Sequence, residues 1–374
     1  MEPQRLIHRL FLSLWVLFLP FWDFGAGVAL VLAFLSAVLP NLQAAKQKWL
    51  DSASFWPLWG IVLMVGVGSI LHEGASLQTH LRLLPIVLLF WAFDRETIQR
   101  SLPLGASVVM LYLLVGGLIR LWEGADASVL VYRGLLAGLH QHVYLGTYLL
   151  LGAVAVHQSA FSSRLKAIYW AITLLFLGLL GAKMLMASAF LAALWWVYRA
   201  KPLPRWAVPA AVLLLLGFGL AQGLSEGRAL GHVLKPVDPY WATGSVDTRV
   251  VQAKAALKAW AEKPWLGWGP ADKQAALEGV YAEWNYRFGL KRHLNVHNQF
   301  LEWTLSYGLV GLGLLLVAAM AGIRRLPKAP WGLILLYFGS LWLTESFMER
   351  SLGVALFALV WAWMADQANL REED

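Results

Sequence analysis

The stretch LPLGASVVMLYLLVGGLI, residues 102–119, decides the fold class, because no side chain in it carries a charge. A helix needs about 20 mostly apolar residues to cross the roughly 30 Å of hydrocarbon in a bilayer. Comparable runs recur along the chain, so we predict an all-α, polytopic membrane protein with about 12 transmembrane helices. The predicted spans centre near residues 15, 33, 63, 86, 111, 150, 173, 191, 214, 309, 338 and 358, and those near 86 and 191 are short.

The composition agrees with this class and excludes others. The 374 residues are 59% hydrophobic and only 14% charged, and a soluble domain of this length could not cover its surface with so few charges. The absence of cysteine excludes disulfides and thiolate metal sites. A net charge of +8 would suit nucleic acid, but the basic residues form short clusters between apolar runs, as topology signals do. We therefore expect no nucleic-acid partner.

The basic clusters also predict the topology. They fall in alternate loops between the predicted spans, and therefore on one side, which should be the cytoplasm together with both termini. These clusters are Arg5 and Arg9, Lys46 and Lys48, Arg95 and Arg100, Arg164 and Lys166, Arg199 with Lys201 and Arg205, and Arg324 with Arg325 and Lys328. We divide the chain into spans 1–9 (residues 1–223), a helical loop on the opposite side (224–296) and spans 10–12 (297–374). The apolar run at 10–22 is expected to be an uncleaved first span, because many spans follow it.

The long loop has the sequence pattern of helices. Asp247 is a candidate N-cap for a helix over about 248–263, which Pro264 would end. One face of this helix is expected to carry apolar side chains at helical spacing, namely Val250, Ala253, Leu257 and Trp260. The glycines and proline at 267–270 predict a turn before a second helix over about 272–287. The pair is typical of amphipathic helices that lie over a membrane, and a structural cap on the bundle would show the same pattern.

Three polar residues stand at predicted membrane edges, where unpaired polar side chains are costly, and a fourth stands in the long loop. His297 and Asn298 precede the span near 309, and the partial positive charge of a helix N-terminus favours a neutral histidine that can act as a general base. Lys183 occupies a tight turn between spans, where a cation could hold a phosphate. Arg249 lies near the start of the loop helix, and a nearby anion would explain a cation there. Capping, snorkelling to the interface and simple surface exposure are the alternative explanations.

Two further clusters carry weaker signals. His140 and His142 form an H-x-H pair, but no carboxylate or cysteine nearby completes a metal site, so we expect no metal. Glu345, Glu349 and Arg350 form a charged turn between the last two spans, and these residues could pair with one another. The sequence contains no P-loop, zinc-protease or serine-nucleophile motif, so neither ATP-driven nor protease chemistry is expected.

The order of these motifs resembles the bacterial O-antigen ligase and polysaccharide polymerase family. Arg249 followed by PWLGWGP at 264–270 is similar to the family's arginine and P-x-x-G-x-G segment. NVHNQFLE at 295–302 followed by YGLVG at 307–311 is similar to its H-N-x-[FY]-L…G-[IL]-x-G signature. HQHVY at 140–144 and TESFMER at 344–350 also look like segments of this family. The resemblance covers the topology of the chain and is sharpest from about 245 to 312.

The resemblance implies an activity and roles for individual residues. The family transfers a glycan from an undecaprenyl-diphosphate carrier to an acceptor on the periplasmic face, which would place this chain in the bacterial inner membrane and make 224–296 a periplasmic loop. By position, His297 would deprotonate the acceptor hydroxyl and Arg249 would hold the donor diphosphate. Lys183 stands where the family usually has an arginine after a serine, and it keeps the charge but loses the bidentate fork.

A larger group of residues is expected at the substrate site without individual roles. These residues are Asn298, His142, Tyr144, Arg292 and Glu345. Diphosphate is a good leaving group once cations compensate its charge, so no cofactor and no metal is expected. A neutral base beside the anomeric carbon would then give displacement with inversion.

The leading hypothesis is an O-antigen ligase that joins a lipid-linked glycan to lipid A–core. A polymerase of the same superfamily is the closest alternative, although the sequence lacks the paired R-x10-G repeats in two periplasmic loops that are associated with many polymerases. A protein O-oligosaccharyltransferase and a lipid-linked glycan transporter rank lower. A transporter should place charges deep within its spans, whereas the distinctive polar residues here gather at the span ends.

Overall fold

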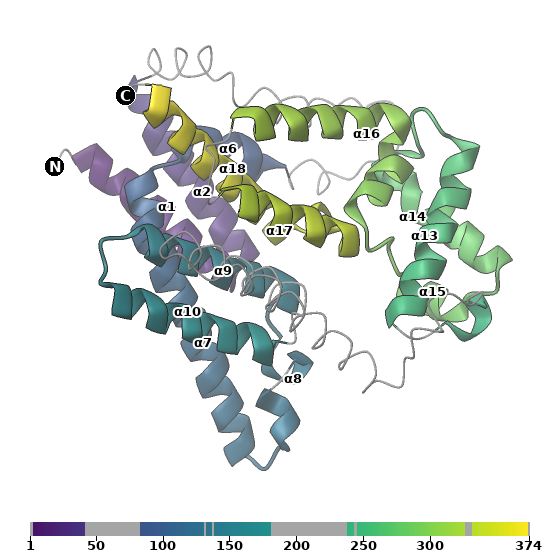
Figure 1. The fold of residues 1–374 in the computed structure, drawn as a ribbon, viewed down its shortest axis with the longest axis horizontal. Helices are drawn as coiled ribbons and strands as arrows, with labels where there is room; N and C mark the ends of the chain where they lie inside the picture. Colours follow the sequence, from purple (N-terminus) through teal and green to yellow (C-terminus); the bar gives the residue numbers. More distant parts are fainter. Residues whose placement is uncertain are drawn as a thin grey trace, which may run out of the picture.

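The computed structural model describes residues 3–41, 83–130, 132–136, 138–180, 238–242, 245–325 and 331–372. Within these ranges the chain has 13 α-helices and no β-strand, which confirms the predicted all-α class (Figure 1). Lys183 and the spans predicted near residues 63, 191 and 214 lie outside the described residues.

Each predicted span centre within the described ranges falls inside a helix. These helices are α1 (Pro3–Phe18), α2 (Asp23–Val38), α6 (Leu84–Ala92), α7 (Arg95–Trp122), α9 (His142–Gln158), α10 (Ser163–Leu179), α16 (Gln299–Arg325), α17 (Trp331–Thr344) and α18 (Ser351–Glu372). Among them, Arg95–Trp122 and Gln299–Val317 are long and apolar enough to cross a membrane, and Asp23–Val38 and Ser351–Met364 are shorter apolar helices. The count of about 12 spans therefore stays a prediction.

The surface of α7 is apolar where water would favour polar side chains. Its large exposed side chains include Leu104, Val108, Leu111, Tyr112, Leu114, Val115, Leu118 and Ile119. A contiguous apolar surface of this kind marks contact with lipid or with protein. Together with the other apolar helices, it is consistent with an integral membrane protein.

Helix α9 is enclosed by its neighbours. Every residue from Val143 to Ala153 is buried, as expected for a helix that is apolar on all sides. Two of its polar side chains form hydrogen bonds with other helices. Tyr148 Oη donates to the carbonyl oxygen of Val16 at 2.8 Å, and Thr147 Oγ1 lies 2.5 Å from Tyr337 Oη. These bonds join α9 to α1 and α17.

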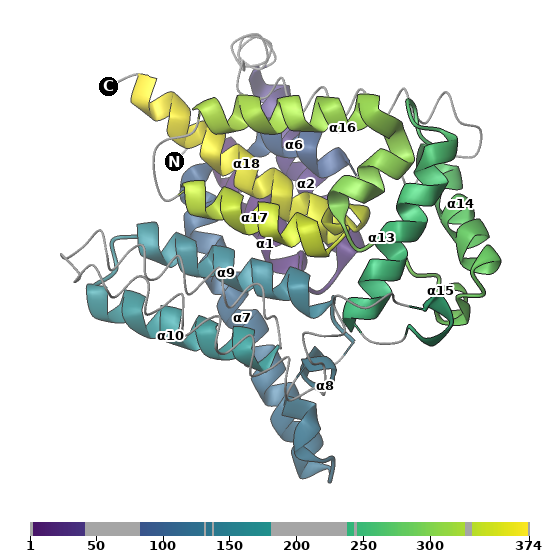
Figure 2. The ribbon, with the colours of Figure 1, turned by 45° about the vertical axis from the view of Figure 1, so that its right-hand side comes forward.

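The long loop folds into a helical unit with its own core, which we call the loop unit (residues 238–242 and 245–296). It contains η4 (Pro239–Trp241), α13 (Ser245–Glu262), α14 (Gly269–Glu283) and α15 (Arg287–Arg292). Its helices gather on one side of the bundle, beside the start of α16 (Figure 2). The core contains Ala242, Val251, Ala255, Ala256, Ala259, Leu277, Val280, Tyr281, Tyr286 and Val296, together with Leu305 of α16. The two helices predicted in this loop are confirmed, with ends that differ by a few residues.

One detail predicted for the first loop helix is wrong, and its buried face differs from its most apolar one. Asp247 is not an N-cap, because α13 begins at Ser245 and includes Asp247 in its first turn. The predicted apolar face is not the buried one, since Leu257 is 46% exposed. The buried stripe consists of Thr248, Val251, Gln252, Ala255, Ala256 and Ala259. Its spacings of three and four residues are helical, and its small alanines allow α13 to pack closely on α14 and α16.

The turn between α13 and α14 contacts a kink in α16. Gly308 interrupts α16 with φ 64° and ψ −161°, and Gly267 in the turn has φ 69°. At the kink, Leu309 N donates to the carbonyl oxygen of Pro264 at 2.9 Å. A Cβ added to Gly308 would lie 2.2 Å from the carbonyl oxygen of Trp265, and one added to Gly267 would lie 2.7 Å from Gly308 N. Close approach and positive φ therefore require glycine at both positions.

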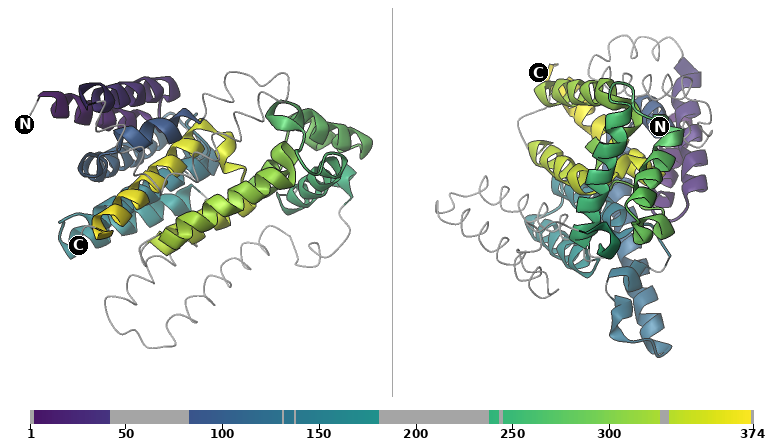
Figure 3. Two further views of the ribbon diagram at one scale, coloured as in Figure 1. Left: turned by 90° about the horizontal axis from the view of Figure 1, so that it is seen from above. Right: turned by 90° about the vertical axis from the view of Figure 1, so that its right-hand side faces the viewer.

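Contacts near helix ends show which ends lie together. Arg9 of α1 contacts Asp94 (Nε to Oδ2, 3.5 Å) and Glu96 (Nη2 to Oε2, 2.6 Å) at the start of α7. His140 Nε2, just before α9, lies 3.4 Å from Asp23 Oδ1 at the start of α2. The start of α1 and the end of α18 lie on the side away from α13–α15 (Figures 1 and 3). The predicted alternation, in which both termini lie opposite the long loop, stays a prediction.

Candidate active site

His297 lies in the short connection between the loop unit and α16. Its backbone φ is 51°, a conformation that residues other than glycine adopt rarely and that clusters at functional sites. The cap of α16 is Asn298, whose Oδ1 accepts from Leu301 N at 3.0 Å while its Nδ2 donates to the carbonyl oxygen of Leu343 at 3.1 Å. Capping therefore does not explain His297.

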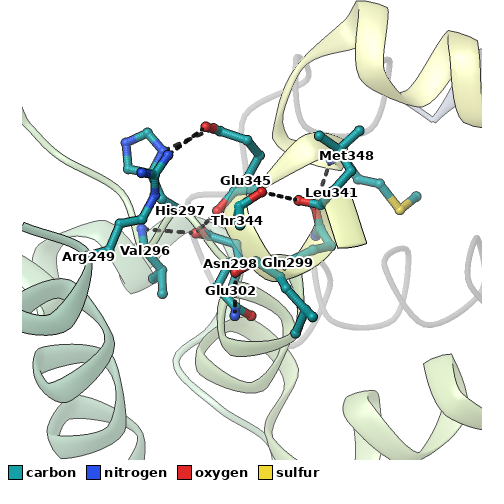
Figure 4. Close-up of polar contacts among 12 residues, drawn as sticks. Arg249, Val296, His297, Asn298, Gln299, Glu302, Leu341, Thr344, Glu345 and Met348 are labelled. Carbon is teal, nitrogen blue, oxygen red and sulfur yellow. Dashed lines mark hydrogen bonds and ion pairs between the residues drawn. The ribbon is translucent and has the colours of Figure 1, made fainter. Parts of the chain in front are cut away.

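The carboxylate of Glu345 joins His297 to Arg249 (Figure 4). Glu345 Oε2 lies 3.0 Å from His297 Nδ1, and Oε1 lies 3.2 Å from Arg249 Nη2. Only 14% of the Glu345 side chain is exposed. Burial alone would raise the pKa of Glu345, but the hydrogen bond with His297 and the charges of His297, Arg249 and His142 outweigh it and lower the pKa. Glu345 is therefore a carboxylate at neutral pH.

Three separate elements bring these side chains together. Arg249 projects from the first turns of α13, His297 precedes α16, and Glu345 directly follows α17. A nearby anion was one of two explanations that the sequence left open for Arg249, the other being simple surface exposure. The structure supplies one from within the chain, the carboxylate of Glu345. The Arg249 side chain remains partly accessible, with 41% of it exposed, so it can also contact a ligand.

The other predicted site residues lie at different distances from this centre. His142 is the first residue of α9, and its charge contributes to the lowered pKa of Glu345. Tyr144 is buried, and its ring stacks on Phe347 with centroids 4.9 Å apart, next to the Glu345 turn. Arg292 is exposed on α15, where its Cζ lies 5.4 Å from the centroid of the Phe288 ring. The structure therefore brings His142 and Tyr144 toward Glu345 and leaves Arg292 on the surface of the loop unit.

A second charged group, missed by sequence reasoning, lies beside the first. Lys273 Nζ is 2.6 Å from Glu302 Oε1 and 2.8 Å from Glu349 Oε2. The three side chains are 10%, 3% and 22% exposed, respectively, and we call them the buried charge cluster. Glu349, which could have paired within its own turn, thus reaches into the loop unit. Glu302 lies in the first turn of α16, where a glutamate is common. A lysine such as Lys273 is usually solvated. The sequence therefore gave no sign that the two side chains would pair.

The pair of His297 and Glu345 can orient a general base. When Nδ1 carries the ring proton, it donates that proton to Glu345 Oε2, and Nε2 keeps its lone pair. A carboxylate in this position fixes the tautomer and the ring orientation of a histidine. Arg249, which is always positively charged, forms an ion pair with the same carboxylate. The site therefore combines an oriented proton acceptor with a partly exposed cation.

One segment of the chain matches a known protein family. Residues 166–317 match a family model described as O-antigen ligase, and glycosyltransferase-like ligases and polymerases make up that family. The matched segment includes Arg249, His297 and most of the motifs that carried the resemblance. No curated protein matches the chain. Residues 166–317 are therefore similar to the O-antigen ligase family, as the sequence motifs predicted.

Proposed function

We propose that this protein is an inverting, metal-independent O-antigen ligase that moves a glycan from undecaprenyl diphosphate to lipid A–core. The observation that carries the proposal is the carboxylate of Glu345, which lies 3.0 Å from His297 Nδ1 and 3.2 Å from Arg249 Nη2. Transfer from a diphosphate donor requires deprotonation of the acceptor and charge compensation of the leaving group. The base and the cation held by Glu345 supply these two functions.

The reaction follows from the orientation of His297. The acceptor hydroxyl approaches Nε2, and its proton moves to this nitrogen as the hydroxyl oxygen attacks the anomeric carbon. The bond between that carbon and the diphosphate oxygen breaks, and its electron pair stays on the diphosphate. Attack from the face opposite the leaving group inverts the anomeric centre. Glu345 stabilises the imidazolium that forms, as the carboxylate of a catalytic triad does, and the proton then passes to solvent.

Cations would hold the donor diphosphate. Arg249 contacts Glu345 through Nη2, and 41% of its side chain is exposed, so a phosphate oxygen can approach this planar cation. Lys183, which lies outside the described residues, is proposed as a second cation that acts as a point charge. The remaining proposed substrate contacts are Asn298, His142, Tyr144 and Arg292.

The proposed location is the bacterial inner membrane, with the site facing the periplasm and both termini in the cytoplasm. The basic clusters between the apolar runs support this orientation through the positive-inside rule. The start of α1 and the end of α18 also lie on the side away from the loop unit, which contains Arg249 (Figure 3).

The identity of the acceptor separates the ligase from the polymerase. The test is to incubate detergent-solubilised protein with an undecaprenyl-diphosphate glycan, with and without purified lipid A–core, and to run His297→Ala in parallel. A ligase attaches the glycan to lipid A–core, and His297→Ala does not. Lengthening of the lipid-linked donor by the wild type, with no product on lipid A–core, would instead identify a polymerase.

Metal independence is tested separately by chelation. Among the residues that the structure describes, no three His, Asp or Glu side chains come together as a metal site. We expect full transfer activity in EDTA, because cationic side chains compensate the diphosphate charge. Complete loss of transfer in EDTA, restored by added Mg²⁺, would contradict this part of the proposal.

A further inference from the structure

The buried charge cluster contacts residues next to His297 and next to Glu345, which we call the catalytic pair. Glu302 uses its second oxygen, Oε2, which lies 3.0 Å from Ser346 Oγ and 3.4 Å from Val296 N. Ser346 directly follows Glu345, and Val296 directly precedes His297. One buried carboxylate is therefore bonded to the neighbours of both the proposed base and its orienting partner.

Two further hydrogen bonds connect the same segments. Gln299 Oε1 accepts from Met348 N at 2.7 Å, and Asn298 Nδ2 donates to the carbonyl oxygen of Leu343. The first bond joins the start of α16 to the stretch between α17 and α18, and the second joins it to the last turn of α17. The geometry of the catalytic pair thus depends on how firmly these two segments are held together.

Lys273 supplies the positive charge that this arrangement needs. Burial alone would lower the pKa of Lys273, but the charges of Glu302 and Glu349, and its hydrogen bonds with them, outweigh burial and raise the pKa. The lysine is therefore protonated at neutral pH. Without this charge, two largely buried carboxylates would share a site with no counter-ion, and one would turn away or take up a proton. Either response would weaken the contacts of Glu302 with Ser346 and Val296.

A gain in stability is a poor explanation for such a cluster. Buried ion pairs often contribute no more stability than apolar side chains of similar size, because desolvation of the charges offsets their attraction. A network with several charge-assisted hydrogen bonds does impose a specific geometry. Here that geometry includes the backbone next to His297 and Glu345.

We propose that Lys273 is a positioning residue, which from α14 of the loop unit holds Glu302 and Glu349 so that His297 and Glu345 keep their pairing geometry. The effect on catalysis rests on the function proposed above, whereas the effect on geometry does not. The loop unit then has two tasks, since it carries Arg249 and also orients the base.

The kinetic test uses three variants in the lipid A–core transfer assay. Lys273→Met removes the charge and leaves an unbranched side chain one heavy atom shorter, Lys273→Arg keeps the charge, and Lys258→Met is the control. Lys258 pairs with Glu283 on the surface of the loop unit, where ion pairs contribute little. Per folded protein, we expect Lys273→Met to lower kcat at least tenfold, as loss of a partner that orients a catalytic side chain typically does. The donor KM should change less than about twofold, because such a loss affects the chemical step rather than ground-state binding.

The outcomes separate positioning from simple stabilisation. Lys273→Arg should recover most of kcat, and Lys258→Met should match the wild type. A Lys273→Met protein that melts earlier but retains the wild-type kcat per folded molecule would overturn the proposal. If Lys273→Met does not fold, Glu302→Gln replaces it in both measurements with the same expected results, because it removes a charge from the same cluster while keeping its size.

A second readout needs no transfer activity. Carboxyl titration of Glu345 is followed by NMR on protein labelled with ¹³C in its glutamate carboxyls, with Glu345→Gln used for assignment. In Lys273→Met, the pKa of Glu345 should rise toward its ordinary value as contact with His297 loosens, and in Lys258→Met it should not change. An unchanged titration in Lys273→Met would overturn the proposal. A shifted titration in protein that transfers no glycan would instead reject the proposed function and leave the positioning role supported.

Discussion

Glu345 Oε2 lies 3.0 Å from His297 Nδ1, although 48 residues separate the two along the chain. The carboxylate follows α17 and the imidazole precedes α16, so neither helix forms the pair alone. Arg249, 96 residues from Glu345, reaches the other carboxylate oxygen from the loop unit. The three side chains form one site only when the loop unit is packed against the bundle.

Removal of the Glu345 charge should slow transfer without abolishing it. Glu345→Gln leaves a side chain of the same size but no longer fixes the His297 tautomer or stabilises the imidazolium. We expect kcat to fall about 10- to 100-fold, the usual effect of losing an orienting partner of a functional histidine. Steady-state transfer kinetics measure this, with Glu283→Gln on the loop-unit surface as the control. A kcat equal to that of the wild type would show that Glu345 does not orient the base.

Arg249 should be sensitive even to a change that keeps its charge. Arg249→Lys loses the planar fork that can contact Glu345 and a phosphate together. A hydrogen bond to a charged group contributes about 1.5–3 kcal/mol, so we expect kcat/KM for the donor to fall roughly 10- to 150-fold. Lys254→Gln, on an exposed position of the same helix, is the control and should behave as the wild type. Equal kcat/KM in Arg249→Lys would argue against contact with the diphosphate.

Gly308 should tolerate no side chain. Gly308→Ala places a Cβ 2.2 Å from the carbonyl oxygen of Trp265. The backbone φ of 64° and ψ of −161° also lie in a region essentially restricted to glycine, where another residue costs about 1–3 kcal/mol. The substitution should lower the melting temperature and loosen the α13–α14 turn from α16. Gly313→Ala lies farther along the same helix, and its Cβ would meet nothing within 4 Å. It should be neutral or slightly stabilising, and equal melting of the two variants would contradict the packing described.

Glu345 should also make the folded protein sensitive to acid. The folded protein lowers its pKa, whereas the unfolded chain restores a value of about 4.3. The stability that Glu345 contributes is therefore fully present above the unfolded-state pKa and is lost as pH falls through the folded-state pKa. The melting temperatures of wild type and Glu345→Gln, followed by tryptophan fluorescence, should differ by a constant amount at neutral pH and converge in acid. A difference that does not depend on pH would contradict the lowered pKa.

The sequence predicted the helices of the bundle well because a long uncharged run has few alternatives to a membrane or core helix. It predicted the packing of α13 less well. Leu257 and Trp260 have the strongest apolar signal, yet the buried stripe is formed largely by alanines such as Ala255 and Ala259. Helices that pack closely need small side chains at their interface, and hydropathy alone does not identify these positions.

Those residues of the candidate site that stand out in the local sequence could be predicted. His297 and Arg249 stand out by their positions at helix ends, and Glu345 stands out as a charge between two apolar runs. The role of Glu345 depends on contacts with residues 48 and 96 positions away along the chain. The local spacing of residues in a helix does not predict such contacts. Lys273 is harder still to predict, because a lysine on an amphipathic helix is ordinarily solvated, and only the packing of α14 near Glu302 buries it.

The most direct test of the proposed catalytic role is chemical rescue of His297→Ala. Single-turnover transfer from the lipid-linked donor is measured for wild type and His297→Ala, with and without added imidazole. If His297 is the general base, the variant should lose about 10²- to 10⁴-fold in rate. Imidazole should then restore part of that rate in a saturable manner, most effectively at a pH where imidazole is neutral. A His297→Ala protein that transfers glycan at the wild-type rate would contradict the account.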